Sequence, residues 1–165
     1  MAINFGNNVT LSQTGGRISA PGRVLQVVQT NNTVGMITSS TAAVDFFYSA
    51  PITLSSAGNR VIIEWHSDNR VNDWYDGSWN LYYMQIVYVN TGAVLSYTGY
   101  RGETTYNIRH YHKNVTHIPG NVGPHTYKLQ GWSYSALPTT FGVPGFGSTS
   151  GSDGISYIRM TEVAV

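Results

Sequence analysis

Two of the chain's eight acidic residues, Asp73 and Asp76, fall in one short segment. A glycosidase uses a pair of carboxyl groups, one as a general acid and the other as a base or nucleophile, so this pair raises the question of glycoside hydrolysis. In such an enzyme the two carboxylates stand on opposite sides of a substrate cleft. Asp73 and Asp76 instead share a segment rich in Asp, Asn and Gly, which is typical of a polar loop. We therefore expect no catalysis at this pair.

Motifs of other enzyme classes are missing from the sequence. It contains no G-x-S-x-G nucleophile elbow, no Walker A loop and no H-E-x-x-H metal motif. The glycine-rich stretch GFGSTSG, residues 145–151, lacks the lysine that a phosphate-binding loop needs. The sequence predicts a protein that is not an enzyme and that has no catalytic residue and no cofactor.

Aromatic side chains are concentrated in the segment that holds the two aspartates. Flat rings stack on the apolar faces of sugars or on partner side chains, and nearby carboxylates and amides bind hydroxyl groups. The segment therefore predicts a contact surface for a ligand or receptor, such as a host surface glycan. The alternative is that one or two of the rings fold back and cap the end of the domain. The candidate contact residues are Asp73, Trp74, Tyr75, Asp76 and Trp79.

Histidines lie close together in RHYHKNVTH, residues 109–117. His110 and His112 would share one face of an extended segment, and imidazole nitrogens ligate first-row metals. Arg109 and Lys113 place positive charge beside them, which disfavours a bound cation. We therefore expect a solvent-exposed loop and predict no metal site here, with metal binding by His110 and His112 left open as an alternative.

The composition limits the classes of partner. Charged residues make up 10% of the chain, against about 25% in a typical globular domain. The net charge of +1 and the absence of a Lys/Arg run predict no nucleic-acid binding. The absence of cysteine excludes disulfides and thiolate metal sites. No stretch is apolar enough to cross a bilayer or to act as a signal peptide, so we expect synthesis in the host cytoplasm and no membrane insertion.

The elements that must position these segments are β-strands. Apolar positions recur with period two among evenly spread glycines, which predicts an all-β protein. Many short strands with glycine-rich connections favour an antiparallel two-sheet β-sandwich, jelly-roll-like, over a closed barrel. We predict an N-terminal arm or edge strand over residues 1–20 and a β-sandwich domain over residues 21–165. The clearest predicted strands are 23–30, 44–48, 60–66, 81–89, 93–98, 126–134 and 155–165, with weaker ones at 34–38 and 104–109.

Two of the predicted strands, GRVLQVVQT at residues 22–30 and LYYMQIVYV at residues 81–89, are apolar on both faces. An uncovered face forfeits about 1.5–3 kcal/mol for each large side chain left in water. Copies of the chain packed about an axis would cover these faces, which predicts a homotrimer. The alternative is a strand covered on both sides by long loops of the same chain. The candidate subunit-interface residues are Leu25, Val27, Tyr82, Met84, Ile86 and Tyr88.

Three stretches of the sequence resemble the small virion surface proteins of marine bacteriophages. They are GRVLQVVQT near the start, HTYKLQGWS in the predicted penultimate strand, and GISYIRMTEVAV at the end. Modules of that family begin with a G-x-VLQVVQ strand, carry a Y-K-[VL]-Q strand and end in S-x-[IL]-x-[AV]-M-E-[IV]. Arg159 and Thr161 interrupt the last pattern here, and residues 67–123 have no counterpart in it.

The resemblance implies a jelly-roll-like fold and a place on the virion surface. It predicts a bacteriophage structural protein, either a capsid decoration or a tail-fibre head subunit, that assembles as a homotrimer with other capsid or tail proteins. A lectin-like module that recognises a host surface glycan through the aromatic segment is the second hypothesis.

Overall fold

The structure, a computed structural model, describes residues 2–4, 10–14, 17–19, 21–71, 80–102, 108–134, 136, 138–142 and 156–165. These residues form β-strands, turns and bends, and none of them is helical. Accordingly, the described part of the chain contains no helix with the length and apolar character needed to span a membrane.

Eight principal strands pair in a nested order. The first pairs with the last, the second with the seventh, the third with the sixth and the fourth with the fifth, and every pair is antiparallel. This is the pairing of one long hairpin rolled up into two sheets, which is a jelly roll. The strands are β4 (Val24–Asn32), β6 (Val44–Tyr48), β8 (Arg60–Val71), β9 (Asn80–Tyr88), β10 (Ala93–Gly102), β11 (Ile108–His117), β13 (Tyr127–Ser133) and β15 (Ser156–Val163).

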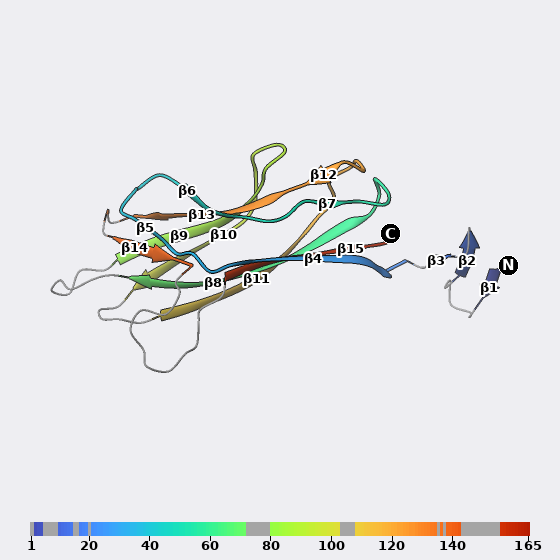
Figure 1. Ribbon diagram of the computed structural model, residues 1–165, viewed down its shortest axis with the longest axis horizontal. Helices are drawn as coiled ribbons and strands as arrows, with labels where there is room; N and C mark the ends of the chain where they lie inside the picture. The colour runs from blue at the N-terminus through green and yellow to red at the C-terminus, as the bar shows by residue number, and fades with distance from the viewer. Residues whose placement is uncertain are drawn as a thin grey trace.

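The two sheets lie face to face and confirm the predicted antiparallel β-sandwich (Figure 1). The first sheet holds β4, β15, β8 and β11 in that order, and the second holds β10, β9, β13 and β6. The short strands β5 (Met36–Thr38) and β14 (Thr139–Phe141) extend the first sheet beyond the ends of β4 and β15. A two-stranded ribbon is formed by β7 (Ile52–Thr53) and β12 (Pro124–His125).

The N-terminal region contributes a small sheet of its own. Its strands are β1 (Ala2–Asn4), β2 (Thr10–Thr14) and β3 (Arg17–Ser19), which pair antiparallel with one another. In Figure 1 they are drawn beyond the end of the sandwich. The division into an arm and a sandwich domain at residue 20 stays a prediction.

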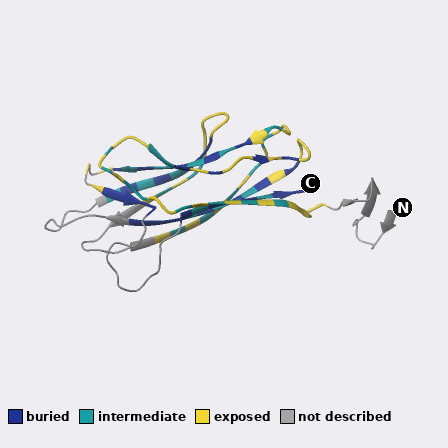
Figure 2. Cartoon of the chain, viewed as in Figure 1, coloured by how far each residue is buried: buried dark blue, intermediate teal, exposed yellow. Residues whose placement is uncertain are grey.

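The hydrophobic core lies between the two sheets (Figure 2). Because side chains alternate along a strand, Val61, Ile63 and Trp65 of β8 all point inward, and each is fully buried. Each large side chain removed from water stabilises the fold by about 1.5–3 kcal/mol. The other large core residues are Phe47, Ile52, Leu54, Tyr82, Met84, Ile86, Tyr88, Tyr127, Leu129, Phe141, Ile158 and Met160.

Four of the six predicted interface residues belong to this core, and their assignment to a subunit interface is wrong. Tyr82, Met84, Ile86 and Tyr88 are at most 4% exposed and point between the sheets. Since both faces of β9 are apolar, the sequence did not indicate which face turns inward. The chain covers these four side chains without help from another copy.

The other two predicted interface residues lie on the surface. Leu25 and Val27 are 36% and 54% exposed on β4, the terminal strand of the first sheet. Their neighbour Val28 points inward against the core. For Leu25 and Val27, contact with another copy stays a prediction.

The buried carboxylate of Glu162, on β15, accepts hydrogen bonds from the segment that follows β7. Glu162 is 1% exposed and accepts hydrogen bonds from the backbone N–H and Oγ of Ser55 and from the amides of Asn59 and Gln26, at 2.6–2.8 Å. Burial alone would raise the pKa of Glu162, but the hydrogen bonds from Asn59, Gln26 and Ser55 outweigh it and lower the pKa. Glu162 therefore serves the fold as an ionised hydrogen-bond acceptor.

Candidate functional site

A band of titratable side chains crosses the outer face of the first sheet. Glu64, His66 and Asp68 alternate along β8 with the core residues, so all three face outward. The strand register places His110 of β11 directly opposite Asp68, and it places Tyr157 of β15 directly opposite His66. Strand pairing therefore gathers acids and imidazoles that are far apart in the sequence.

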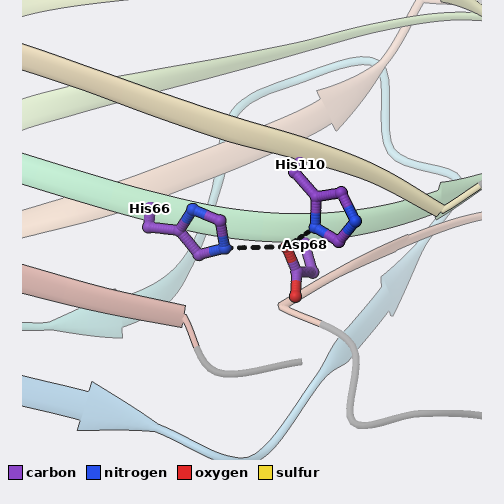
Figure 3. Close-up of side chains that lie close together, drawn as sticks. All are labelled: His66, Asp68 and His110. Carbon is purple, nitrogen blue, oxygen red and sulfur yellow. Dashed lines mark hydrogen bonds and ion pairs between the residues drawn. The ribbon is translucent and has the colours of Figure 1, made fainter. Parts of the chain in front are cut away.

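Asp68 lies at the centre of this band, between two histidines. Its Oδ1 is 2.8 Å from Nε2 of His66 and 2.6 Å from Nδ1 of His110 (Figure 3). The aspartate is 4% exposed, whereas the side chain of His110 is 69% exposed. The two imidazole rings are stacked, with their centroids 6.1 Å apart. The ion-pair partners described for this buried carboxylate are the two imidazoles.

Glu64, four residues before Asp68 on β8, carries a second carboxylate on this face. It accepts a 2.6 Å hydrogen bond from the hydroxyl of Tyr157, and it lies 3.2 Å from Nε2 of His112 and 3.5 Å from Nη1 of Arg159. The hydrogen bond from Tyr157 is the main reason that the pKa of Glu64 is lowered. Burial, and then the same hydrogen bond, raise the pKa of Tyr157.

Stacked planar groups connect the two carboxylates. The ring of Tyr157 lies against that of His66 with a centroid distance of 5.5 Å, and the guanidinium of Arg159 lies 5.5 Å from the Tyr157 ring centroid. The row continues from His66 to His110. These contacts limit the freedom of the His66 ring, which keeps its Nε2 directed at Asp68.

His110 and His112 lie on a strand, so the expected loop at this segment is wrong. They do share one face, as an extended segment requires, but they contact different carboxylates: His110 contacts Asp68 and His112 contacts Glu64. His66 and Asp68 could not be recognised from the sequence as neighbours of His110, because Asp68 and His110 are 42 residues apart. The register of β8 and β11 is needed to bring them together.

The outer face of the second sheet carries a cluster of aromatic rings, Tyr83, Tyr97, Trp132 and Tyr134, which we call the aromatic platform. Tyr83 stacks on Trp132 with centroids 5.3 Å apart, and Tyr97 and Tyr134 each lie 6.2 Å from Tyr83. Tyr97 and Tyr134 are at least 60% exposed. The platform therefore presents flat apolar surface and phenol hydroxyl groups to solvent.

Polar side chains border the aromatic platform on the same sheet. The amide of Gln85 donates a 2.6 Å hydrogen bond to Gln130, whose own amide donates to Asp45. Asp45 also pairs with Lys128 at 2.8 Å. Burial opposes ionisation of Asp45, but the bonds from Lys128, Tyr48 and Gln130 lower its pKa.

The predicted contact residues Asp73, Trp74, Tyr75, Asp76 and Trp79 lie outside the described residues, which leave out 72–79. Their proposed role in contacting a ligand or receptor therefore stays a prediction.

No protein-family model matches the chain, and no curated protein is similar to it. The resemblance to virion proteins of marine bacteriophages therefore stays a prediction from the sequence. Among solved structures, the chain is similar to the crystal structure of the infectious bursal disease virus VP2 subviral particle. The TM-score is 0.42 at 9% identity, over 98% of this chain and 49% of that chain, so this chain spans about half its length. The strand pairing described above, rather than that likeness, establishes the fold class.

Proposed function

We propose that the protein is a structural, non-enzymatic subunit of a virus particle that packs against copies of itself and other virion proteins. Jelly rolls serve as capsid domains and also as lectins, so the fold alone does not choose between these roles. The observation that carries the proposal is the apolar, uncharged edge strand β4. The stretch GRVLQVVQT, which resembles the opening strand of phage virion modules, overlaps this strand and pairs with β15, whose sequence resembles the closing strand of those modules apart from Arg159 and Thr161.

The surface of β4 suits contact between copies of the chain. Natural proteins protect an edge strand with charges, prolines or bulges, because its unpaired N–H and C=O groups invite another strand. Residues Val24–Asn32 contain neither a charged residue nor a proline, and the one irregularity in their pairing with β15 is a register shift at Leu25, near the start of the strand. Val24, Leu25 and Val27 are 36–54% exposed there, and the neighbouring Val165 is 73% exposed. Three copies about an axis would cover this strip, which supports a homotrimeric capsid decoration or tail-fibre head of a bacteriophage.

Imaging of the virus particle tests this function directly. Gold-labelled antibodies against the purified chain are expected to decorate the surface of intact particles, and a cryo-electron microscopy map should show the jelly roll there in groups of three. Antibody absorbed with the purified chain is the control. Particles that lack the chain by mass spectrometry would overturn the virion role.

The aromatic platform favours a second candidate function, recognition of a host surface glycan. Exposed rings next to amide and charged side chains provide both stacking surface and hydrogen bonds for a sugar. In a glycan array, the chain should bind one class of glycan, and Trp132→Ala or Tyr97→Ala should reduce the signal at least tenfold. Val94→Ala is the control, because Val94 is an exposed residue of the same sheet outside the platform and its polar border.

Variants in the predicted aromatic segment separate the two possible glycan contacts. Loss of binding in Trp74→Ala or Trp79→Ala, with binding kept in Trp132→Ala, would move the contact to that segment. Absence of glycan binding by the wild-type chain would remove the lectin function.

A further inference from the structure

We propose that His66, Asp68 and His110 form a binding site for one divalent first-row transition metal ion, which fastens β8 to β11. Two imidazole nitrogens and one carboxylate oxygen are a donor set that proteins use for zinc and for non-haem iron. The three donor atoms lie within 4.8 Å of one another. The proposal concerns a site on the first sheet and does not depend on the virion role.

The backbone sets the spacing of these donors. His66 and Asp68 are two residues apart on one strand, so they share its outer face, and His110 is the direct cross-strand partner of Asp68. Metal–ligand bonds of about 2.0–2.1 Å hold neighbouring donors roughly 3.0–3.3 Å apart. The observed separations from Asp68 are 2.8 Å and 2.6 Å. The ion would be admitted if these two separations opened by a few tenths of an ångström and the two imidazole nitrogens, which lie within 4.8 Å of each other, took a similar spacing.

The charge balance at Asp68 also favours a cation. Burying a carboxylate is costly unless it is paired or coordinates a metal. Glu64, on the same face of β8, is compensated by Arg159 as well as by Tyr157 and His112. Asp68 is more deeply buried than Glu64, and the ion-pair partners described for it are the two histidines. A divalent ion bound here would place positive charge directly beside this buried carboxylate.

The orientation of the ligands is already fixed on one side of the site. The His66 ring is held between the rings of Tyr157 and His110. The His110 side chain is 69% exposed, so solvent reaches the site and an ion can enter. Three protein donors leave at least one coordination position for water.

Zinc titration of tag-free, chelator-treated full-length protein tests the proposal. Calorimetry is expected to give one Zn²⁺ per chain, and thermal melting should shift upward with added Zn²⁺ because the ion binds the folded state. Mg²⁺ at the same concentration should leave the melting temperature unchanged, since it prefers oxygen ligands. A wild-type chain that takes up no Zn²⁺ would overturn the proposal.

Two single-residue variants locate the ion. His110→Ala should weaken Zn²⁺ binding at least tenfold and abolish the thermal shift, and circular dichroism of the metal-free variant should show the wild-type fold, because His66 still pairs with Asp68. His112→Ala is the matched control, because His112 lies on the same face of β11 but contacts Glu64. Equal Zn²⁺ binding by the wild type and His110→Ala would contradict the site, as would loss of binding in His112→Ala alone.

Discussion

Tyr83 of β9 lies directly against Gly99, its cross-strand partner on β10. A Cβ atom added at Gly99 would stand only 2.6 Å from Cδ1 of Tyr83. The missing side chain lets the Tyr83 ring lie along the sheet, where Trp132 stacks on it. The arrangement of the aromatic platform thus depends on the absence of a side chain at Gly99.

Gly99→Ala is expected to push the Tyr83 ring aside and break its stack on Trp132. The clash is with ring atoms of a half-buried side chain that can swing away, so the cost should be only about 1 kcal/mol. Near-ultraviolet circular dichroism should therefore change while urea unfolding changes little. Gly58→Ala is the control, because a Cβ at Gly58 meets nothing within 4 Å. An unaltered near-ultraviolet spectrum in Gly99→Ala would show that the ring does not rest on the glycine.

Ile86 and Val27 were both predicted from the sequence to lie at a subunit interface, but one is in the core and the other on the surface, so truncating them should have different effects on stability. Ile86 is fully buried, so Ile86→Ala is expected to reduce the free energy of unfolding by about 2–5 kcal/mol. Val27 is 54% exposed, so Val27→Ala should change it by no more than about 0.5 kcal/mol in the dilute chain. Urea unfolding measures both changes. Losses of similar size would mean that β9 does not face the core as described.

The lowered pKa of Glu162 predicts a pH-dependent contribution to stability. A glutamate whose folded-state pKa lies below its ordinary value of 4.5 stabilises the fold above that pH, and this stability is lost as the pH falls through the folded-state pKa. Glu162→Gln should cost about 1–3 kcal/mol at pH 7, because it replaces a charged acceptor of several hydrogen bonds. The deficit relative to wild type should shrink as the pH falls below 4.5. Urea unfolding at pH values on both sides of 4.5 checks it, and a deficit independent of pH would contradict the assignment.

Much of the strand framework could be predicted from local sequence patterns. The predicted strand at residues 44–48 matches β6, and runs rich in β-branched and aromatic residues located β4, β9 and β13 to within about two residues. Strand β11 was missed because Lys113 occupies a position between Tyr111 and Val115, which both pack against the core. The Lys113 ammonium donates to the carbonyl oxygen of Tyr97, 3.0 Å away on the other sheet, so a charged residue fits where the pattern calls for an apolar one.

The candidate sites could not be predicted because each is assembled across strands. Sequence proximity drew attention to His110 and His112, whereas the structure joins His110 to Asp68 and His66 through strand register. Likewise, Tyr83 and Trp132 of the aromatic platform are ordinary alternating residues until β9 and β13 pair. Local patterns indicate which residues share a face of one strand, but not which strand lies beside it.

Sedimentation velocity of the full-length chain tests most directly whether β4 joins copies of the protein. The wild type is expected to sediment as a trimer, and Val27→Glu as a folded monomer, because the new charge would be buried against a neighbouring copy. Circular dichroism would verify that the variant keeps its fold, as the exposure of Val27 predicts. A wild-type chain that stays monomeric at micromolar concentrations, or a Val27→Glu chain that still forms trimers, would contradict assembly through this strand.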